Sequence, residues 1–62
     1  MKIGDIVTPS QESIEKKANW GVAGRKYLVV RELTQDSFML KDLENGSYID
    51  GYVDEFVVIE RK

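Results

Sequence analysis

Tyrosines and carboxylates alternate near the C-terminal end of the chain, and these residue types commonly contact partner molecules. Tyr48, Asp50 and Tyr52 are spaced by two residues, and Asp54 follows at the same interval. Side chains at this spacing lie on one face of a β-strand, where the two tyrosines would form a patch about 13 Å long. The patch could bind a peptide or stack bases. Ordinary packing against a neighbouring strand would explain the same tyrosines.

The chain has a single tryptophan, Trp20, which lies between Asn19 and Gly21. Tryptophan is enriched among the residues that dominate binding energy at interfaces, so Trp20 is a candidate contact with a protein partner. The same ring could instead cover one open end of a small core and bury on the order of 200 Å². Both interpretations stay open at this stage.

Asp50, Asp54 and Glu55 form the densest acidic group of the sequence. Neighbouring carboxylates can bind hard cations or perform acid–base chemistry, but this spacing does not match a calcium-binding EF-hand loop. The chain also contains no histidine and no cysteine, which removes the commonest general base and the commonest metal ligands. We therefore expect no catalytic residue, metal site or cofactor, and a solvated acidic rim that could attract a basic partner.

Basic residues are concentrated in the first half of the chain. Residues 1–31 carry six basic and three acidic side chains, whereas residues 32–62 carry three and eight. Five of the basic residues could neutralise phosphates while Trp20 or Tyr27 stacks a base: Lys16, Lys17, Arg25, Lys26 and Arg31. Solubility and protection of strand edges would explain most of these charges equally well. Binding of single-stranded or structured nucleic acid is thus the alternative to protein binding.

Length and composition indicate one small folded domain that spans residues 1–62. The hydrophobic fraction is 42% and the charged fraction 32%, which is typical of globular proteins. No apolar run approaches the roughly 18 to 20 residues of a membrane span, and the N-terminal residues lack the apolar stretch of a signal peptide. We expect a cytoplasmic protein without membrane association.

Five short β-rich runs, separated by turn residues, dominate the chain. Phe38 and Leu40 alternate with polar neighbours and are expected in the core, together with Ile6 or Val7. Asn45 and Gly46 favour a tight hairpin turn, because both tolerate positive φ angles, and Gly51 indicates a kink. The expected strands cover residues 4–8, which Pro9 ends, and residues 27–33, 37–42, 48–53 and 56–59.

A long polar segment, residues 10–24, separates the first two strands. Its composition is compatible with one or two helical turns, with Ser10 as the cap and Glu12 in the first turn. Residues 54–55 are expected to form a single turn before the last strand. Five strands, a long first loop with a helical turn and a tight last turn indicate an all-β fold of the SH3-like barrel type.

The same pieces resemble small SH3-like proteins, many of them from phages and prophage-like elements. The resemblance rests on Lys-x-Gly-Asp-x-Val at residues 2–7, Gly-Arg-Lys-Tyr-Leu-Val at 24–29, Glu-Asn-Gly at 44–46 and Tyr-x-x-x-Phe-x-x-Ile at 52–59. It covers most of the chain outside residues 9–22, although Arg25-Lys26 departs from the usual order. It implies an accessory or modulator protein that binds host or phage components and has no shared active site.

Overall fold

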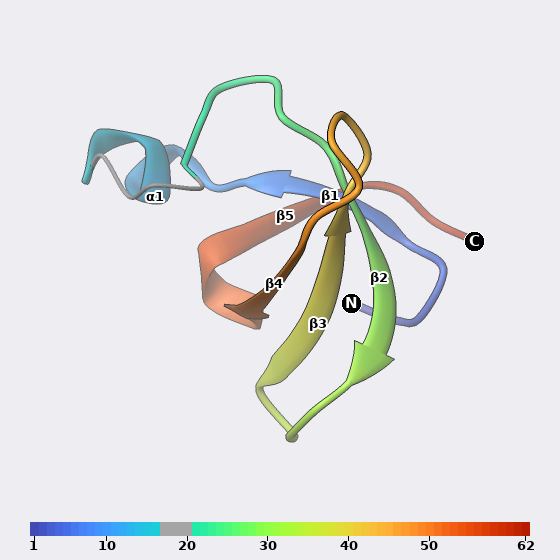
Figure 1. The fold of residues 1–62 in the computed structure, drawn as a ribbon. Helices are drawn as coiled ribbons and strands as arrows, with labels where there is room; N and C mark the ends of the chain where they lie inside the picture. The colour runs from blue at the N-terminus through green and yellow to red at the C-terminus, as the bar shows by residue number, and fades with distance from the viewer. Residues whose placement is uncertain (17–20) are drawn as a thin grey trace.

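The computed structural model describes residues 1–16 and 21–62 and contains five β-strands in one antiparallel sheet (Figure 1). The sheet order is β4-β3-β2-β1-β5, so β4 and β5 are its two edges and the sheet is not closed. The all-β prediction is confirmed. The elements are β1 (Ile6–Pro9), α1 (Gln11–Glu15), β2 (Tyr27–Glu32), β3 (Ser37–Asp42), β4 (Tyr48–Tyr52), the 3-10 helix η1 (Val53–Glu55) and β5 (Phe56–Glu60).

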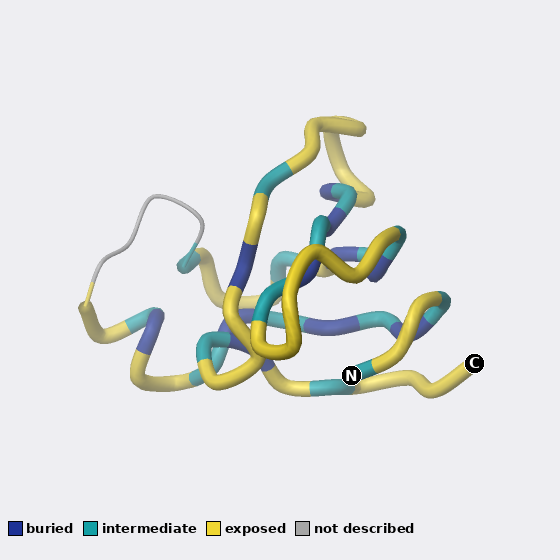
Figure 2. The backbone as a smooth tube through the Cα atoms, turned by 90° about the horizontal axis from the view of Figure 1, so that it is seen from below, coloured by how far each residue is buried: buried dark blue, intermediate teal, exposed yellow. Residues whose placement is uncertain are grey.

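The core is formed by alternate side chains of four strands, as the alternating burial in Figure 2 illustrates. Its members are at most 6% exposed: Val7, Tyr27, Val29, Phe38, Leu40 and Phe56. The rings of Tyr27 and Phe56 meet edge to face with centroids 5.6 Å apart, an arrangement that aromatic pairs prefer. The core predictions for Val7, Phe38 and Leu40 are confirmed.

Tyr27 does not lie where a nucleic-acid base could stack on it, and this corrects the expectation from the sequence. Its side chain is 1% exposed and packs inside the sheet, and burial raises the pKa of its phenol. The aromatic ring supplies more core surface than any aliphatic residue could at this central position.

The first strand differs from its predicted bounds and includes Pro9, which pairs with Phe56 of β5. The next residue, Ser10, donates its N–H to the Glu55 carbonyl, 2.9 Å away. Because hydrogen-bonded pairs alternate along an antiparallel ladder, the position of Pro9 requires no N–H toward β5. Proline is therefore accommodated in the strand instead of ending it.

The hairpin between β3 and β4 is confirmed, but its loop comprises residues 43–47. Gly46 has a positive φ of 77° and donates its N–H to the Asp42 carbonyl. The Asp42 carboxylate accepts the N–H groups of Glu44 and Asn45, at 2.8 and 3.3 Å. Since this carboxylate organises the backbone that follows it, the turn is longer than the two-residue type that Asn45-Gly46 favours.

Gly51 lets the side chains of Phe56 and Leu40 approach the backbone of β4 closely, and the pairing of β3 with β4 runs through it without a shift in register. This pairing excludes a bulge at Gly51, but it does not test the predicted kink, which stays a prediction. A Cβ atom at this position would collide with the Phe56 ring and lie 3.0 Å from Leu40 Cδ1. The missing side chain lets the core pack directly against β4.

Candidate partner-binding groove

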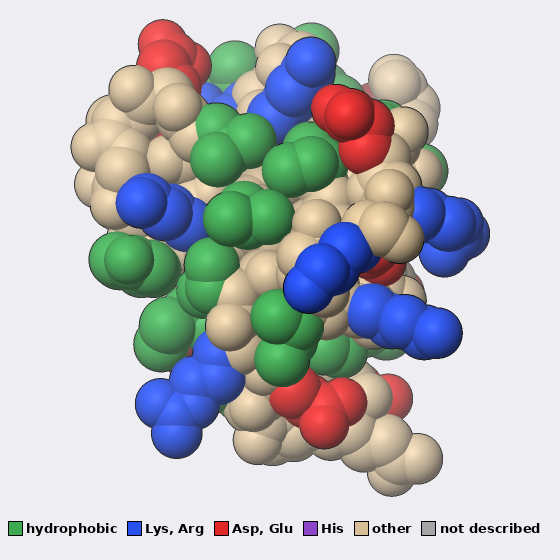
Figure 3. All heavy atoms as spheres, turned by 90° about the vertical axis from the view of Figure 1, so that its right-hand side faces the viewer, with side chains coloured by type: hydrophobic (Ala, Val, Ile, Leu, Met, Phe, Trp, Pro, Cys, Tyr) green, Lys and Arg blue, Asp and Glu red, His purple; other side chains and the backbone are tan. Residues whose placement is uncertain are grey.

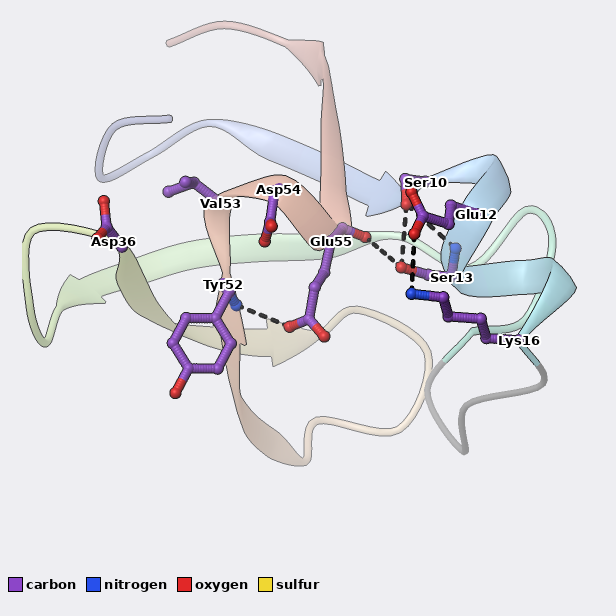
Figure 4. Close-up of a pocket in the computed structure, with 9 residues that line it drawn as sticks. All are labelled: Ser10, Glu12, Ser13, Lys16, Asp36, Tyr52, Val53, Asp54 and Glu55. Carbon is purple, nitrogen blue, oxygen red and sulfur yellow. Dashed lines mark hydrogen bonds and ion pairs between the residues drawn. The ribbon is translucent and has the colours of Figure 1, made fainter.

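A groove of about 570 Å³ lies between α1 and η1 (Figure 4). Four carboxylates and one lysine line it, together with Tyr52, Val53 and two serines. The full lining is Ser10, Glu12, Ser13, Lys16, Asp36, Tyr52, Val53, Asp54 and Glu55. Two elements that are distant in sequence thus form a shared concave surface.

One wall is α1, whose formation follows from its first residues. Ser10 caps the helix, since its Oγ accepts the Ser13 N–H at 3.2 Å. Glu12 lies in the first turn and forms an ion pair with Lys16, 2.8 Å away. The predicted short helix with this cap is confirmed.

The other wall is η1, which begins after Tyr52. The Glu55 carboxylate turns back and accepts the Tyr52 N–H at 3.0 Å. The Glu55 carbonyl accepts both the Ser10 N–H and the Ser13 hydroxyl, each at 2.9 Å. These two bonds join the walls of the groove, so its shape depends on contacts between segments about forty residues apart.

Asp36 closes the far end of the groove (Figure 4). It belongs to the turn between β2 and β3, and its carbonyl accepts the Val53 N–H at 2.8 Å. Sequence reasoning missed Asp36 and Ser13 as groove residues. Ser13 follows a recognisable helix cap, but neither residue carries a local signal for its long-range contact.

The described residues that line the groove carry four carboxylates and one lysine, Lys16, which is already paired with Glu12. The Glu12 carboxylate raises the pKa of Lys16 through its hydrogen bond and charge, and the charges of Asp54 and Glu55 contribute in the same direction. Lys16 in turn lowers the pKa of Glu12. The carboxylates of Asp36, Asp54 and Glu55 make no ion pair with another described residue. They can therefore form ion pairs with cationic side chains of a partner.

The predicted partner-binding residues are partly brought together. Tyr52 and Asp54 line the groove, and the Tyr52 side chain is 59% exposed. Tyr48 and Asp50 are exposed on β4, outside the groove. Trp20 lies outside the described residues, so its role stays a prediction.

The basic residues proposed for nucleic-acid binding are in different surroundings. Lys16 lies in the acidic groove. Arg25 is directed at Asp42 and Glu44, at 3.4 and 3.5 Å, and its pKa is raised by a hydrogen bond with Tyr27 and by these charges. Lys26 and Arg31 are exposed on the surface, and Lys17 lies outside the described residues.

On the face in Figure 3, Lys and Arg side chains lie in several separate places, with hydrophobic side chains between some of them. Nothing in these placements favours nucleic acid over protein, and nucleic-acid binding stays a prediction.

The residues that the structure describes contain no cluster of three or more acidic, histidine or cysteine side chains that could hold a metal ion. In the same part of the chain, neither helix has the length and apolar character needed to cross a membrane. The lining of the groove offers charged groups, hydroxyl groups and one exposed aromatic ring.

The expected likeness to phage-type SH3-like proteins, and the accessory role that it implies, stay predictions. No protein-family model, curated protein or solved structure matches the chain.

Proposed function

We propose that this protein is a small non-enzymatic binding module of the SH3-like barrel type, which takes a basic segment of a partner protein into the acidic groove. The barrel assignment is supported by the sheet order β4-β3-β2-β1-β5 and by the 3-10 turn between the last two strands. The long first loop with its short helix supports it as well.

The observation that carries the proposal is the combination of shape and charge in the groove. Asp36, Asp54 and Glu55 surround a concave surface next to the exposed ring of Tyr52. Arg and Lys side chains pair with carboxylates and also stack their cationic groups on aromatic faces. A basic segment would thus find both kinds of contact within one groove.

A flexible nine-residue Gly-Ser peptide with two central arginines tests this proposal against the same peptide with two glutamates. Titration followed by amide NMR should shift the signals of Ser13, Tyr52 and Asp54 with the arginine peptide alone, and added salt should weaken binding. Absence of groove shifts at low salt would refute the groove proposal. Equal binding of a short RNA or DNA, tested by fluorescence polarisation, would favour the nucleic-acid alternative.

Two groove variants sharpen the test. Asp54→Asn should weaken arginine-peptide binding by up to about 1 kcal/mol, the usual upper value for an exposed ion pair, and Tyr52→Ala should remove the stacking contact. Glu60→Gln is the matched control, because it removes one negative charge from an exposed residue of β5 outside the groove lining. An equal loss with Glu60→Gln would mean that overall charge, not the groove, governs binding.

A further inference from the structure

Strand β4 is an edge of the sheet, and its outer face carries exposed side chains. Tyr48 and Tyr52 are each 59% exposed, and Asp50 between them is exposed too. On the side of β3, the pairing is regular over five consecutive residue pairs, from Lys41 with Tyr48 to Ser37 with Tyr52. Within residues 1–16 and 21–62, no strand pairs with the opposite side of β4.

The hydrogen bonds at both ends of β4 show which peptide groups face β3. Asp42 donates its N–H to the Ser47 carbonyl at 2.7 Å, and Val53 donates to the Asp36 carbonyl at 2.8 Å. These positions alternate along an antiparallel ladder. Residues 47, 49, 51 and 53 therefore bond toward β3, and residues 48, 50 and 52 present their peptide groups to the open edge.

The bond made by Tyr52 supports this orientation independently. Its N–H donates to the Glu55 carboxylate, which takes the place of the carbonyl acceptor that a neighbouring strand would supply at that end of β4. Among the described residues, no such side-chain acceptor serves the N–H groups of Tyr48 and Asp50. Two adjacent outward positions of the edge are thus left for another chain.

The other edge, β5, has protection that β4 lacks. Its pairing with β1 shifts between Val7–Val58 and Ile6–Glu60, which makes Ile59 a bulged residue. Bulges twist an edge away from further strands. The segment after β5 is also tied down, because the Lys62 N–H bonds the buried Asp5 carboxylate at 3.1 Å. An added strand would meet fewer obstacles at β4.

The charge of Asp50 discriminates between a second copy of this chain and a partner strand as the occupant of the β4 edge. Asp50 makes no ion pair with another described residue. A second copy of this chain, paired antiparallel so that Tyr48 meets Tyr52, would place two Asp50 carboxylates opposite each other. Like charges directly opposite are destabilising, whereas opposite charges are stabilising. A strand with a cation at that position would match the edge better than a second copy.

We propose that the β4 edge binds an extended segment of a partner protein as an added β-strand, with a Lys or Arg side chain opposite Asp50 and apolar side chains beside Tyr48 and Tyr52. The inference rests on the proposed function in taking a protein segment as the ligand. It differs in using the open backbone of β4 and not the groove, and the alternating apolar and basic residues define the partner segment.

The test uses a capped seven-residue peptide, Thr-Val-Thr-Lys-Thr-Val-Thr, and its counterpart with a central glutamate. The lysine peptide should bind about fivefold more tightly than the glutamate peptide. Binding should slow amide hydrogen exchange at Tyr48 and Asp50 and leave Ile49 and Gly51 unchanged. Charge reversal by Asp50→Lys should invert the preference between the two peptides.

Glu60→Gln is the matched control, because it removes one exposed carboxylate that belongs neither to β4 nor to the groove lining. It should not change the preference for the lysine peptide. No binding of that peptide, or binding without slower exchange at Tyr48 and Asp50, would overturn the edge proposal. NMR shifts confined to Ser13 and Asp54 would also overturn the edge proposal, but they would support the groove proposal. Dimerisation of the free protein through β4 would show that the edge binds a second copy of the chain and not a partner segment.

Discussion

Two aspartates are buried to the same degree, yet they organise the chain in different ways. Asp5 and Asp42 are each 3% exposed. Asp42 accepts two N–H groups from the residues that follow it and faces the guanidinium of Arg25. Asp5 instead accepts the N–H groups of Lys2 and Lys62, at 2.9 and 3.1 Å, and so joins the two ends of the described chain.

A buried carboxylate can thus be stabilised with or without a close ion pair. The N–H groups of Lys62 and Lys2 hold the pKa of Asp5 below its ordinary value, against an opposing effect of burial. At Asp42, the two carboxylate oxygens have different partners: Oδ1 accepts both backbone N–H groups, and Oδ2 faces Arg25. The two sites should therefore respond differently to the same substitution.

The largest expected effect is that of Asp42→Ala. The variant leaves two turn N–H groups without their acceptor and removes the buried carboxylate that faces Arg25. We expect the free energy of unfolding to fall by about 3 kcal/mol. Urea denaturation would measure it. Asp42→Asn separates the two roles, because its amide oxygen can still accept the turn N–H groups while its NH₂ group cannot pair with Arg25. A loss as large as that of the alanine variant would show that the turn contributes little.

Asp5→Asn should have a smaller effect, and the effect should depend on pH. In the original protein the Lys2 N–H bonds Oδ2 of Asp5 and the Lys62 N–H bonds Oδ1. The asparagine amide has an NH₂ group in place of one of these oxygens, so it can keep only one of the two bonds. Because the pKa of Asp5 is lowered in the folded state, its contribution is present above the ordinary value of 3.8 and is lost as the pH falls through the lowered value. Unfolding curves from pH 6 to pH 2 should therefore show less acid destabilisation in Asp5→Asn than in the original protein.

Asp42 supplies the control for that experiment, since Asp42→Asn should retain the acid sensitivity that Asp5 confers. Identical pH profiles for Asp5→Asn and the original protein would contradict the assignment. Amide exchange at Lys62 should also become faster in Asp5→Asn, because its acceptor at Oδ1 is weakened or lost.

The smallest expected effect is that of Glu44→Gln. Glu44 lies 3.5 Å from Arg25, but its side chain is 75% exposed, and exposed ion pairs contribute little. We expect a change in the free energy of unfolding within about 0.5 kcal/mol, measured by the same urea titration. A loss close to that of Asp42→Ala would mean that Arg25 depends on both carboxylates equally.

The contrast between the two aspartates also shows what could be predicted from the sequence. Asp42 stands just before Asn45-Gly46, a local turn signal, and the hairpin there was predicted although its loop length was not. Asp5 accepts a hydrogen bond from Lys62, 57 positions away in the sequence, and no local sequence pattern predicts such a contact. The exposure of Tyr48 and Tyr52 followed from alternation along β4, but the groove beside Tyr52 did not.

Local patterns in the sequence were enough to predict the five strands, the Ser10 cap and half of the core residues, because strand alternation and capping depend on neighbouring residues. Three features depend on the fold of the whole chain: the bond between Ser13 and Glu55 that joins the walls of the groove, the contact of Gly51 with Phe56, and the unpaired edges at β4 and β5. These features depend on which distant segments meet. Contacts between distant segments are set by packing over the whole chain, so they cannot be predicted from a short stretch of sequence.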